Sequence, residues 1–318
     1  MRRVRAILQR REMTTLAALV LVVAVFSVLN PIYLSGANLI DVVAQATING
    51  LIAIGMTFAI ITGGIDLSVG AVMAVVIVSV GKLLTAGGVP PALGAILGVA
   101  LGVCLGTING LMVTKLGLQP FVATLATMSI YRGVAYVMTG GWPVLNVPRS
   151  FRRMIDGSIA GVIPTAILIL VGFALLGHLI LARSRTGLYI LAIGGNQEAT
   201  RLSGVNIARH KIVAYAICGA GAALAGLVML ARLGTGEPTA GTGYELNAIA
   251  AAAIGGTSLA GGKGSVVGTL LGALLLAGLK VGLVVEHVDS FWQYIATGGI
   301  IAFAAYFEIV RERINARS

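Results

Sequence analysis

Charged residues make up only 10% of this 318-residue sequence, which contains 11 acidic residues and three histidines. An enzyme in a membrane needs titratable groups that converge near an interface. Here the acidic residues are spread along the chain, and His178, His210 and His287 are scattered. No His-Glu zinc pattern, nucleophile elbow or Ser-His-Asp set occurs in a usable frame. The sequence therefore predicts no catalytic residue, no metal site and no enzymatic activity of its own.

Cysteine is equally scarce, with Cys104 and Cys218 alone. Both lie inside apolar segments, so they are interpreted as small packing residues rather than as a disulfide or a metal-binding pair. They carry no information about the redox compartment.

One glycine-rich segment approaches a phosphate-binding loop but does not have its spacing. That motif requires Gly, four residues, Gly, Lys and then Ser or Thr. Here Gly256 is followed by Gly261, but Gly262 intervenes before Lys263, and Gly264 replaces the hydroxyl residue. We therefore predict that this chain binds no nucleotide and no other cofactor.

Apolar residues dominate the sequence, at 58%, and the mean hydropathy is +0.99. Segments of about 18 to 25 apolar residues, long enough to cross a hydrocarbon core of about 30 Å, recur along nearly the whole chain. The 44 glycines suit a bundle in which small residues allow helix backbones to approach closely. The sequence predicts an all-α polytopic membrane bundle embedded in the lipid bilayer, without a sizeable soluble domain.

About ten transmembrane or re-entrant helices are expected. The predicted spans are 14–30, 38–62, 66–82, 92–114, 119–138, 163–182, 208–231, 243–259, 264–285 and 291–308. Residues 14–308 then form a single transmembrane domain between a basic N-terminal tail, 1–13, and a C-terminal tail, 309–318.

The formal net charge of +11 is explained by topology. Basic residues of membrane proteins concentrate in cytoplasmic loops, and ten spans bring both termini and the middle loop to the same side. Both termini are therefore predicted to be cytoplasmic, and no nucleic-acid partner is predicted. The basic residues on that side are Arg2, Arg3, Arg5, Arg10, Arg11, Arg183, Arg185, Arg201, Arg209, Lys211, Arg311, Arg313 and Arg317.

The predicted external loop, 139–163, is an exception because it carries Arg149, Arg152 and Arg153. One interpretation is that a few loop charges have no particular role. The other is that these arginines dock an acidic partner protein. Both interpretations stay open at this stage.

Glycines interrupt the hydrophobic pattern twice in a similar way, at 62–70 and at 255–264. Interrupted spans in corresponding positions indicate a transport site, because non-helical backbone at membrane depth is tolerated only where it is buried in protein or lines a cavity. Two cytoplasmic turns are the alternative.

Asp66 is the most distinctive residue of the first interruption. A carboxylate near membrane depth has to be paired, neutral or hydrated. Asp66 precedes Ser68 at a helix start, where a carboxylate can cap free backbone N–H groups. A structural cap and direct contact with solute are both consistent with this position.

Uncharged polar residues lie inside the predicted spans and could match the hydroxyl groups of a polyol. Each of them can equally form an interhelical hydrogen bond. Arg132 and Lys280 lie near the outer ends of their spans, where long side chains can extend to the interface, so they are not assigned to the pathway. The tentative pathway set is Asn49, Asp66, Ser68, Asn109, Thr124, Thr127 and Asn247.

The predicted cytoplasmic loop between spans 163–182 and 208–231 contains a helix signal. Asn196 is a good N-cap, Glu198 favours the first turn, and Gly204 suits the stop, so a two-turn helix is expected. Such a helix could present a knob to a cytoplasmic protein, or it could rest on lipid. The segment, 194–206, includes Gly194, Gly195, Asn196, Gln197, Glu198, Ala199, Arg201, Leu202, Ser203 and Gly204.

Three blocks together resemble a known family, the permease subunits of bacterial ABC importers for ribose and related monosaccharides. The blocks are 63–70 (GGIDLSVG), 194–199 (GGNQEA) with 202–204 (LSG), and 252–258 (AAIGGTS) with 261–265 (GGKGS). They occur in order along nearly the whole chain. Any one of them would be modest evidence, but together they are specific.

The resemblance implies a permease in the bacterial inner membrane that forms a homodimer or pairs with a paralogue. It also implies two cytoplasmic ATPase subunits that use the ATP, a periplasmic solute-binding protein, and an ATPase-coupling role for the segment from Gly194. Permeases for branched-chain amino acids are the nearest rival, and a self-contained secondary transporter is the alternative of a different class.

Overall fold

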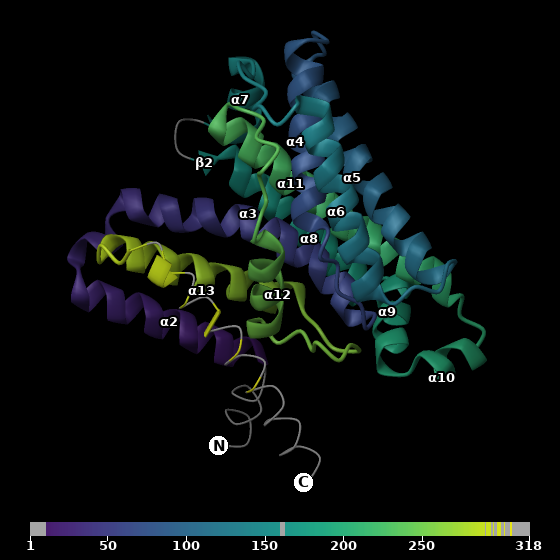
Figure 1. The fold of residues 1–318 in the computed structure, drawn as a ribbon. Coiled ribbons are helices and arrows are strands. Elements are labelled where there is room, and N and C mark those ends of the chain that lie inside the picture. The colour runs from purple at the N-terminus through teal and green to yellow at the C-terminus, as the bar shows by residue number, and fades with distance from the viewer. Residues whose placement is uncertain are drawn as a thin grey trace, which may run out of the picture.

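The computed structural model describes residues 11–159 and 163–289, together with 291–293, 295, 298, 299, 302 and 306. This part of the chain is a bundle of helices (Figure 1). The long helices are α2 (Arg11–Leu29), α3 (Gly36–Ile61), α4 (Val69–Thr85), α5 (Pro91–Thr114), α6 (Pro120–Thr139), α8 (Thr165–Arg183), α11 (Ile207–Leu233) and α13 (Val266–Val285). The shorter helices are η1 (Pro31–Leu34), α7 (Arg149–Asp156), α9 (Arg185–Gly195), α10 (Gln197–Leu202) and α12 (Tyr244–Ile254).

The all-α membrane fold is confirmed for the described residues. Seven helices are long and apolar enough to cross a membrane, and α4 and α12 are shorter apolar helices of 17 and 11 residues. The predicted span 291–308 and the tail 309–318 lie wholly or mostly outside the described residues. The count of about ten spans and the side of the termini therefore stay predictions.

Helix α2 begins at Arg11, close to the predicted start of the first span at 14, and residues 1–10 of the predicted N-terminal tail lie outside the described residues. One predicted boundary was wrong. The predicted span 243–259 is only half a span, since its helix ends at Ile254, before two glycines.

The predicted external loop, 139–163, contains more regular structure than expected. It forms α7, followed by strand β1 (Ser158–Ile159), which pairs antiparallel with β2 (Ile163–Pro164). Pro148 precedes α7 and fixes an extended entry into this helix. The loop therefore presents its arginines on a helix rather than on irregular backbone.

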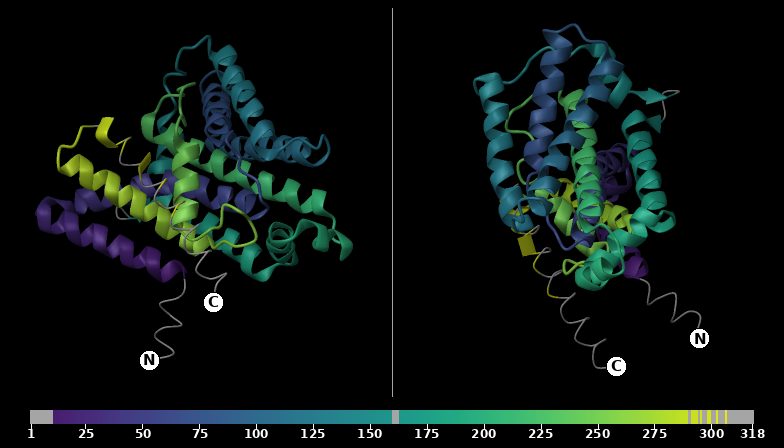
Figure 2. Two further views of the ribbon diagram at one scale, coloured as in Figure 1. Left: turned by 60° about the horizontal axis from the view of Figure 1, so that its bottom comes forward. Right: turned by 90° about the vertical axis from the view of Figure 1, so that its right-hand side faces the viewer.

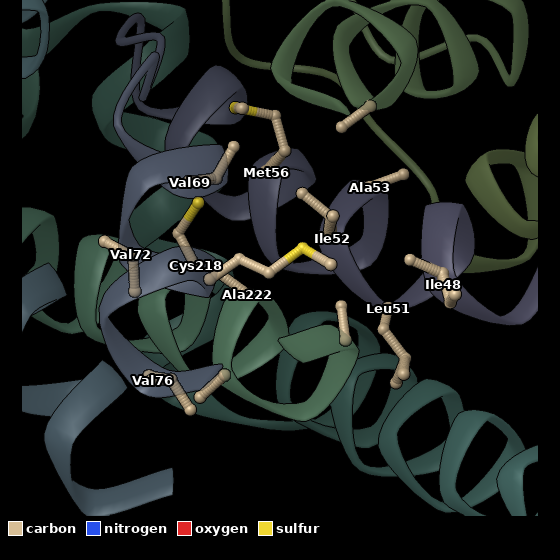
Figure 3. Packing of buried hydrophobic residues seen from close by; sticks show 14 of the residues in the cluster. Ile48, Leu51, Ile52, Ala53, Met56, Val69, Val72, Val76, Cys218 and Ala222 are labelled. Atoms are coloured by element: carbon tan, nitrogen blue, oxygen red, sulfur yellow. The ribbon is translucent and has the colours of Figure 1, made fainter. Parts of the chain in front are cut away.

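The core lies between α3, α4 and α11. Every residue of α3 from 46 to 61 is buried, which is typical of a helix enclosed by protein. Ile52 and Met56 of α3, Val72 of α4, and Cys218 and Ala222 of α11 pack side by side (Figure 3). The burial of Cys218 confirms its predicted role as a packing residue.

The outer helices present apolar side chains to their surroundings, as lipid-facing helices do. Val28 of α2 and Val137 of α6 are 84% and 86% exposed. Helix α13 packs against α3, and α2 packs against α13, at one side of the bundle (Figure 1). Most of the surface of the described chain is therefore suited to hydrocarbon, which makes its polar parts informative.

Glycine spacing explains the close packing of α5 on α11 and α4. Five buried glycines recur at every fourth residue of α5, from Gly94 to Gly110. A Cβ atom at Gly102 or Gly106 would overlap the backbone of α11, at Gly219 and Tyr215 respectively. The prediction that small residues bring helix backbones together is confirmed for this pair.

The two ends of the bundle carry different elements. Helix α7 and strand β2 lie at one end, whereas α9 and α10 lie at the other (Figures 1 and 2). The middle of the bundle separates the arginine-bearing helix from the predicted coupling segment.

Candidate functional site

A buried polar network surrounds Asp66, in the connection between α3 and α4. Asp66 Oδ1 accepts hydrogen bonds from the backbone N–H of Ser68 at 3.0 Å and from the Ser68 hydroxyl at 2.7 Å. The side-chain amide of Asn109 on α5 donates to both carboxylate oxygens at 3.2 Å and to Ser68 Oγ at 2.7 Å. The Cys218 thiol is also within hydrogen-bonding reach of the carboxylate. All four residues are fully buried or nearly so.

The network extends to α6. The Tyr131 hydroxyl donates to the Leu105 carbonyl at 3.0 Å and lies 3.4 Å from Asn109 Oδ1. Thr124 Oγ1 donates to the carbonyl of Ile65, the residue before Asp66, at 3.1 Å. These bonds tie the non-helical connection to α5, α6 and α11. Asp66 forms no ion pair with another described residue.

The structure brings five of the seven tentative pathway residues together. Asp66, Ser68, Asn109 and Thr124 belong to the network, and Thr127 donates to the Thr124 carbonyl at 3.2 Å. Each of these five is at most 1% exposed. In this conformation they form a buried, hydrogen-bonded cluster and do not line an open passage.

Asn49 and Asn247 lie apart from this cluster. Asn49 is buried in α3, and its Oδ1 has no hydrogen-bond partner among the described residues. Asn247 is half-buried on α12, and its side chain makes no hydrogen bond with the described chain. The structure therefore does not assemble the seven residues into one site.

The glycine-broken segments and the predicted coupling segment meet at one junction. The Gly262 N–H donates to the Ile61 carbonyl, at the end of α3, at 2.9 Å. A Cβ atom at Gly194, on the last turn of α9, would overlap both Ile61 O and Gly262 N. Gly261, in a left-handed conformation with φ +92°, lies against Gly63 and Gly194. Three distant sequence blocks therefore converge within backbone contact.

Helix α10 extends from this junction. The Asn196 side chain caps it by accepting from the Ala199 N–H at 2.9 Å, and Gly204 follows with φ +81°. The expected short helix is therefore present, with the predicted cap and stop. On its exposed surface Arg201 Nη2 lies 2.6 Å from Glu198 Oε1. This hydrogen bond and the negative charge of Glu198 raise the pKa of the Arg201 guanidinium.

The opposite end carries three exposed arginines on α7. Phe151 and Ile155 bury the apolar side of the helix, which leaves Arg149, Arg152 and Arg153 exposed. The three arginines line a cavity of about 260 Å³ together with Asp156 and Arg232. A second cavity, of about 610 Å³, shares Asp156 and Arg232 with it.

The cavity contains one ion pair, between Arg232 Nη2 and Asp156 Oδ1 at 3.4 Å. Arg152 Nε donates to the Ala231 carbonyl at 3.1 Å. The side chains of Arg149 and Arg153 make no hydrogen bond with the described residues. Their charges are available to an acidic surface.

Sequence reasoning missed the role of Arg132 on α6. Its side chain does not extend to the interface; it turns inward, and its Nη1 donates to the carbonyls of Pro238 and Ala240 at 2.7 Å each. These acceptors lie in residues 234–243, between α11 and α12. A run of Gly, Thr and Pro there indicates turns but gives no sign of the arginine that holds them.

No group of three or more His, Cys, Asp or Glu side chains in the described chain is arranged to hold a metal ion. The polar groups of the Asp66 network are carboxylate, amide and hydroxyl groups that already bond one another. The described geometry is a buried, hydrogen-bonded connection between α3 and α4, with exposed polar side chains on α7 and α10.

Comparison with known proteins gives a consistent result. A family described as "Branched-chain amino acid transport system / permease component" matches residues 38–305. The ribose import permease protein RbsC of Bacillus subtilis (strain 168) is 43% identical over 91% of this chain and 90% of its own length. RbsC of Escherichia coli (strain K12) is 42% identical over 92% of each chain. The D-allose transport system permease protein AlsC of E. coli K12 is 39% identical over 91% of this chain and 89% of its own. No solved structure matches significantly.

Proposed function

The chain belongs to the family of branched-chain amino acid transport system permease components, and on that premise we propose that it is the permease subunit of an ABC importer for a monosaccharide. Its solute is a ribose-like pentose, a hexose or a related polyol. The protein lies in the bacterial inner membrane as a multi-pass subunit. It carries no catalytic chemistry itself, because ATP is hydrolysed by a separate ATPase.

The observation that carries this proposal is the identity of about 40% to permeases whose names specify ribose and allose, over about nine-tenths of each chain. The family description mentions branched-chain amino acids, which were the nearest rival. The sugar permeases match nearly end to end, which favours a sugar over a branched-chain amino acid.

Helix α10 and the preceding glycines are proposed to contact the ATPase. The supporting geometry is that α10 is exposed and that Gly194, just before it, touches Ile61 at the end of α3 and Gly262 in the second glycine-broken segment. A Cβ atom at Gly195 would meet nothing within 4 Å. If the ATPase seats there, Gly195→Trp or Glu198→Arg will prevent its co-purification, whereas unchanged assembly and transport would contradict the contact.

The arginines of α7 are proposed to dock the periplasmic binding protein. Exposed Arg149 and Arg153 border a basic cavity, and basic side chains steer acidic partners into contact. Replacing both with glutamate should weaken binding-protein association, and the effect should diminish as salt rises.

A second permease, identical or paralogous, completes the proposed complex. Transport would proceed as helix rearrangement exposes a central pathway alternately to each side. The Asp66 network is proposed to hold the α3–α4 connection during this change, and it is not proposed to contact the solute.

The test is solute uptake into vesicles. Vesicles with the chain alone are compared with vesicles that also contain the candidate ATPase, the binding protein and internal ATP, across pentoses, hexoses and branched-chain amino acids. Uptake of a sugar only in the complete system is the expected result. Uptake driven by an ion gradient through the chain alone would overturn the proposal in favour of a secondary transporter, and uptake of amino acids alone would overturn the sugar assignment.

A further inference from the structure

Residues 234–243 run beside α4 and α6 without forming a helix. They leave α11 beside Val144, whose backbone pairs with Gly236, and they descend to Gly70 near the start of α4 (Figure 1). Helix α12, of 11 residues, then continues to the glycine junction. The chain between α11 and the glycine junction is therefore irregular in its first half and helical in its second half.

The depth of this segment follows from its contact with α6. Arg132 lies seven residues before the end of α6 at Thr139, or about 10 Å along the helix axis. Its guanidinium holds the Pro238 and Ala240 carbonyls. The irregular backbone therefore lies well inside the span of α6 and not at its end.

The backbone of the segment is only partly satisfied. Among the described residues, the N–H groups of Thr239 and Thr242 have no hydrogen-bond acceptor, and the side chains of both are exposed. An exposed N–H group without a partner costs several kcal/mol in hydrocarbon, by order of magnitude. Lipid therefore cannot cover this face.

The side chains on the same face are polar. Thr239 and Thr242 present hydroxyl groups, of which that of Thr242 donates to the Thr239 carbonyl at 2.8 Å, and half-buried Asn247 presents an amide that makes no hydrogen bond with the described residues. By contrast, the exposed face of α6 presents residues such as Val137. A dry protein interface would leave the same donors and acceptors to be matched one by one, whereas water and a hydroxyl-rich solute satisfy them in several arrangements.

Glu245 fixes the lower end of this face. Its Oε1 accepts from the Gly243 N–H at 3.2 Å, and a Cβ atom at Gly70 would lie 2.7 Å from Oε2. The carboxylate therefore sits at the N-terminal turn of α4, where negative charge is favoured. It anchors the turn and makes no hydrogen bond with the threonines or with Asn247.

We propose that Thr239, Thr242 and Asn247 form a solute-contacting wall of a water-filled passage, the segment wall, which binds the hydroxyl groups of a neutral polyol. Arg132 is a positioning residue, because it holds the backbone that carries the wall. The proposal rests on the proposed import of sugar, and it places solute contact on the α11–α12 segment rather than on the Asp66 network.

The test uses single cysteines in the complete transporter, with ATPase and binding protein, in membrane vesicles. Cys104 is exposed and is first replaced by serine, whereas Cys218 is buried and stays. Thr239→Cys, Thr242→Cys and Asn247→Cys are each treated with a small, positively charged methanethiosulfonate. Val137→Cys is the matched control, because Val137 is 86% exposed and lies among apolar residues on the outer face of α6.

Reagents of this kind attack the thiolate, which forms only where water reaches the sulfur. We expect the wall cysteines to react at least about tenfold faster than Val137→Cys, and the transported sugar to slow that reaction. The three positions are read independently, so one variant that fails to assemble leaves two tests.

Sugar uptake is measured in the same vesicles for the parent protein, which carries Cys104→Ser and therefore has no exposed cysteine in the described chain. If the parent imports sugar but the wall cysteines react as slowly as the control, the face is covered by lipid or by protein and the inference is wrong. Fast reaction that no transported sugar slows would also overturn solute contact. If the complete system imports no sugar at all, the proposed function fails instead.

Discussion

The side-chain amide of Asn109 donates to both carboxylate oxygens of Asp66, with each nitrogen-to-oxygen distance 3.2 Å. The two residues come from different elements, α5 and the α3–α4 connection. Asn109 also faces Tyr131 through its own oxygen. A single amide therefore bridges a buried carboxylate and a buried phenol, and it fixes a non-helical connection in the protein interior.

Asn109→Leu should destabilise the protein markedly. Leucine has a similar volume but leaves the Asp66 carboxylate without its amide donor and Tyr131 without one acceptor. Removing one partner from a buried polar pair costs about 1–3 kcal/mol, and more when a charged group is left. We expect the free energy of unfolding to fall by about 3 kcal/mol, measured by denaturant titration in detergent micelles.

Asn247→Leu is the matched control, because this asparagine is half-buried and makes no side-chain hydrogen bond with the described chain. Its unfolding free energy should change little. Equal stability of Asn109→Leu and Asn247→Leu would mean that the network contributes nothing measurable.

Asp66→Asn separates a structural role from a direct role in solute transfer. Asparagine keeps the oxygen that accepts from Ser68, and the Asn109 amide can rotate to offer its oxygen to the new N–H group. A residue that only holds the connection should therefore tolerate this change, and sugar uptake by the complete transporter should be largely retained. Loss of uptake in a variant that still assembles with its partners would instead assign a direct role to the charge.

Local signals explain which parts of the site could be predicted from the sequence. The cap at Asn196 and the stop at Gly204 lie within one short segment, so the helix between them was predictable. The partners of Asp66 and Arg132 were not, because Asn109 is 43 residues from Asp66, and Pro238 is 106 residues from Arg132. Only packing decides such pairs.

The same reasoning explains the failure at residues 243–259. The predicted span runs to residue 259, although Gly255, Gly256, Thr257 and Ser258 already interrupt the apolar pattern after Ile254. The backbone leaves the helix at Gly255, and glycine at that position accepts the close approach of Gly268 on α13. Composition indicated glycine-rich turns but not which elements they contact.

Gly194→Ala should damage the junction, whereas Gly195→Ala should be tolerated. A Cβ atom at Gly194 would overlap Ile61 O and Gly262 N, both of which belong to backbone and cannot move aside cheaply. A Cβ atom at Gly195 meets nothing within 4 Å. We expect Gly194→Ala to lose sugar-stimulated ATP hydrolysis by the complete transporter, or to lose assembly altogether. Equal activity of the two alanine variants would show that the junction adapts.

Arg132→Met should impair transport more than it impairs assembly. Methionine retains much of the apolar stem but removes both hydrogen bonds to the Pro238 and Ala240 carbonyls. Each charge-assisted bond contributes about 1.5–3 kcal/mol, so the segment should lose its fixed position, and uptake should fall by about tenfold or more.

Lys280→Met provides the matched control for Arg132→Met, because the Lys280 side chain on α13 is exposed and makes no hydrogen bond with the described residues. The two substitutions remove the same charge, so a general effect of charge on membrane insertion would appear in both. Arg132→Lys should restore uptake only in part, since the lysine side chain is one bond shorter and its ammonium group cannot reach both carbonyls as well as Arg132 Nη1 does. If Arg132→Met transports as well as Lys280→Met, the arginine does not hold the segment wall in its working position.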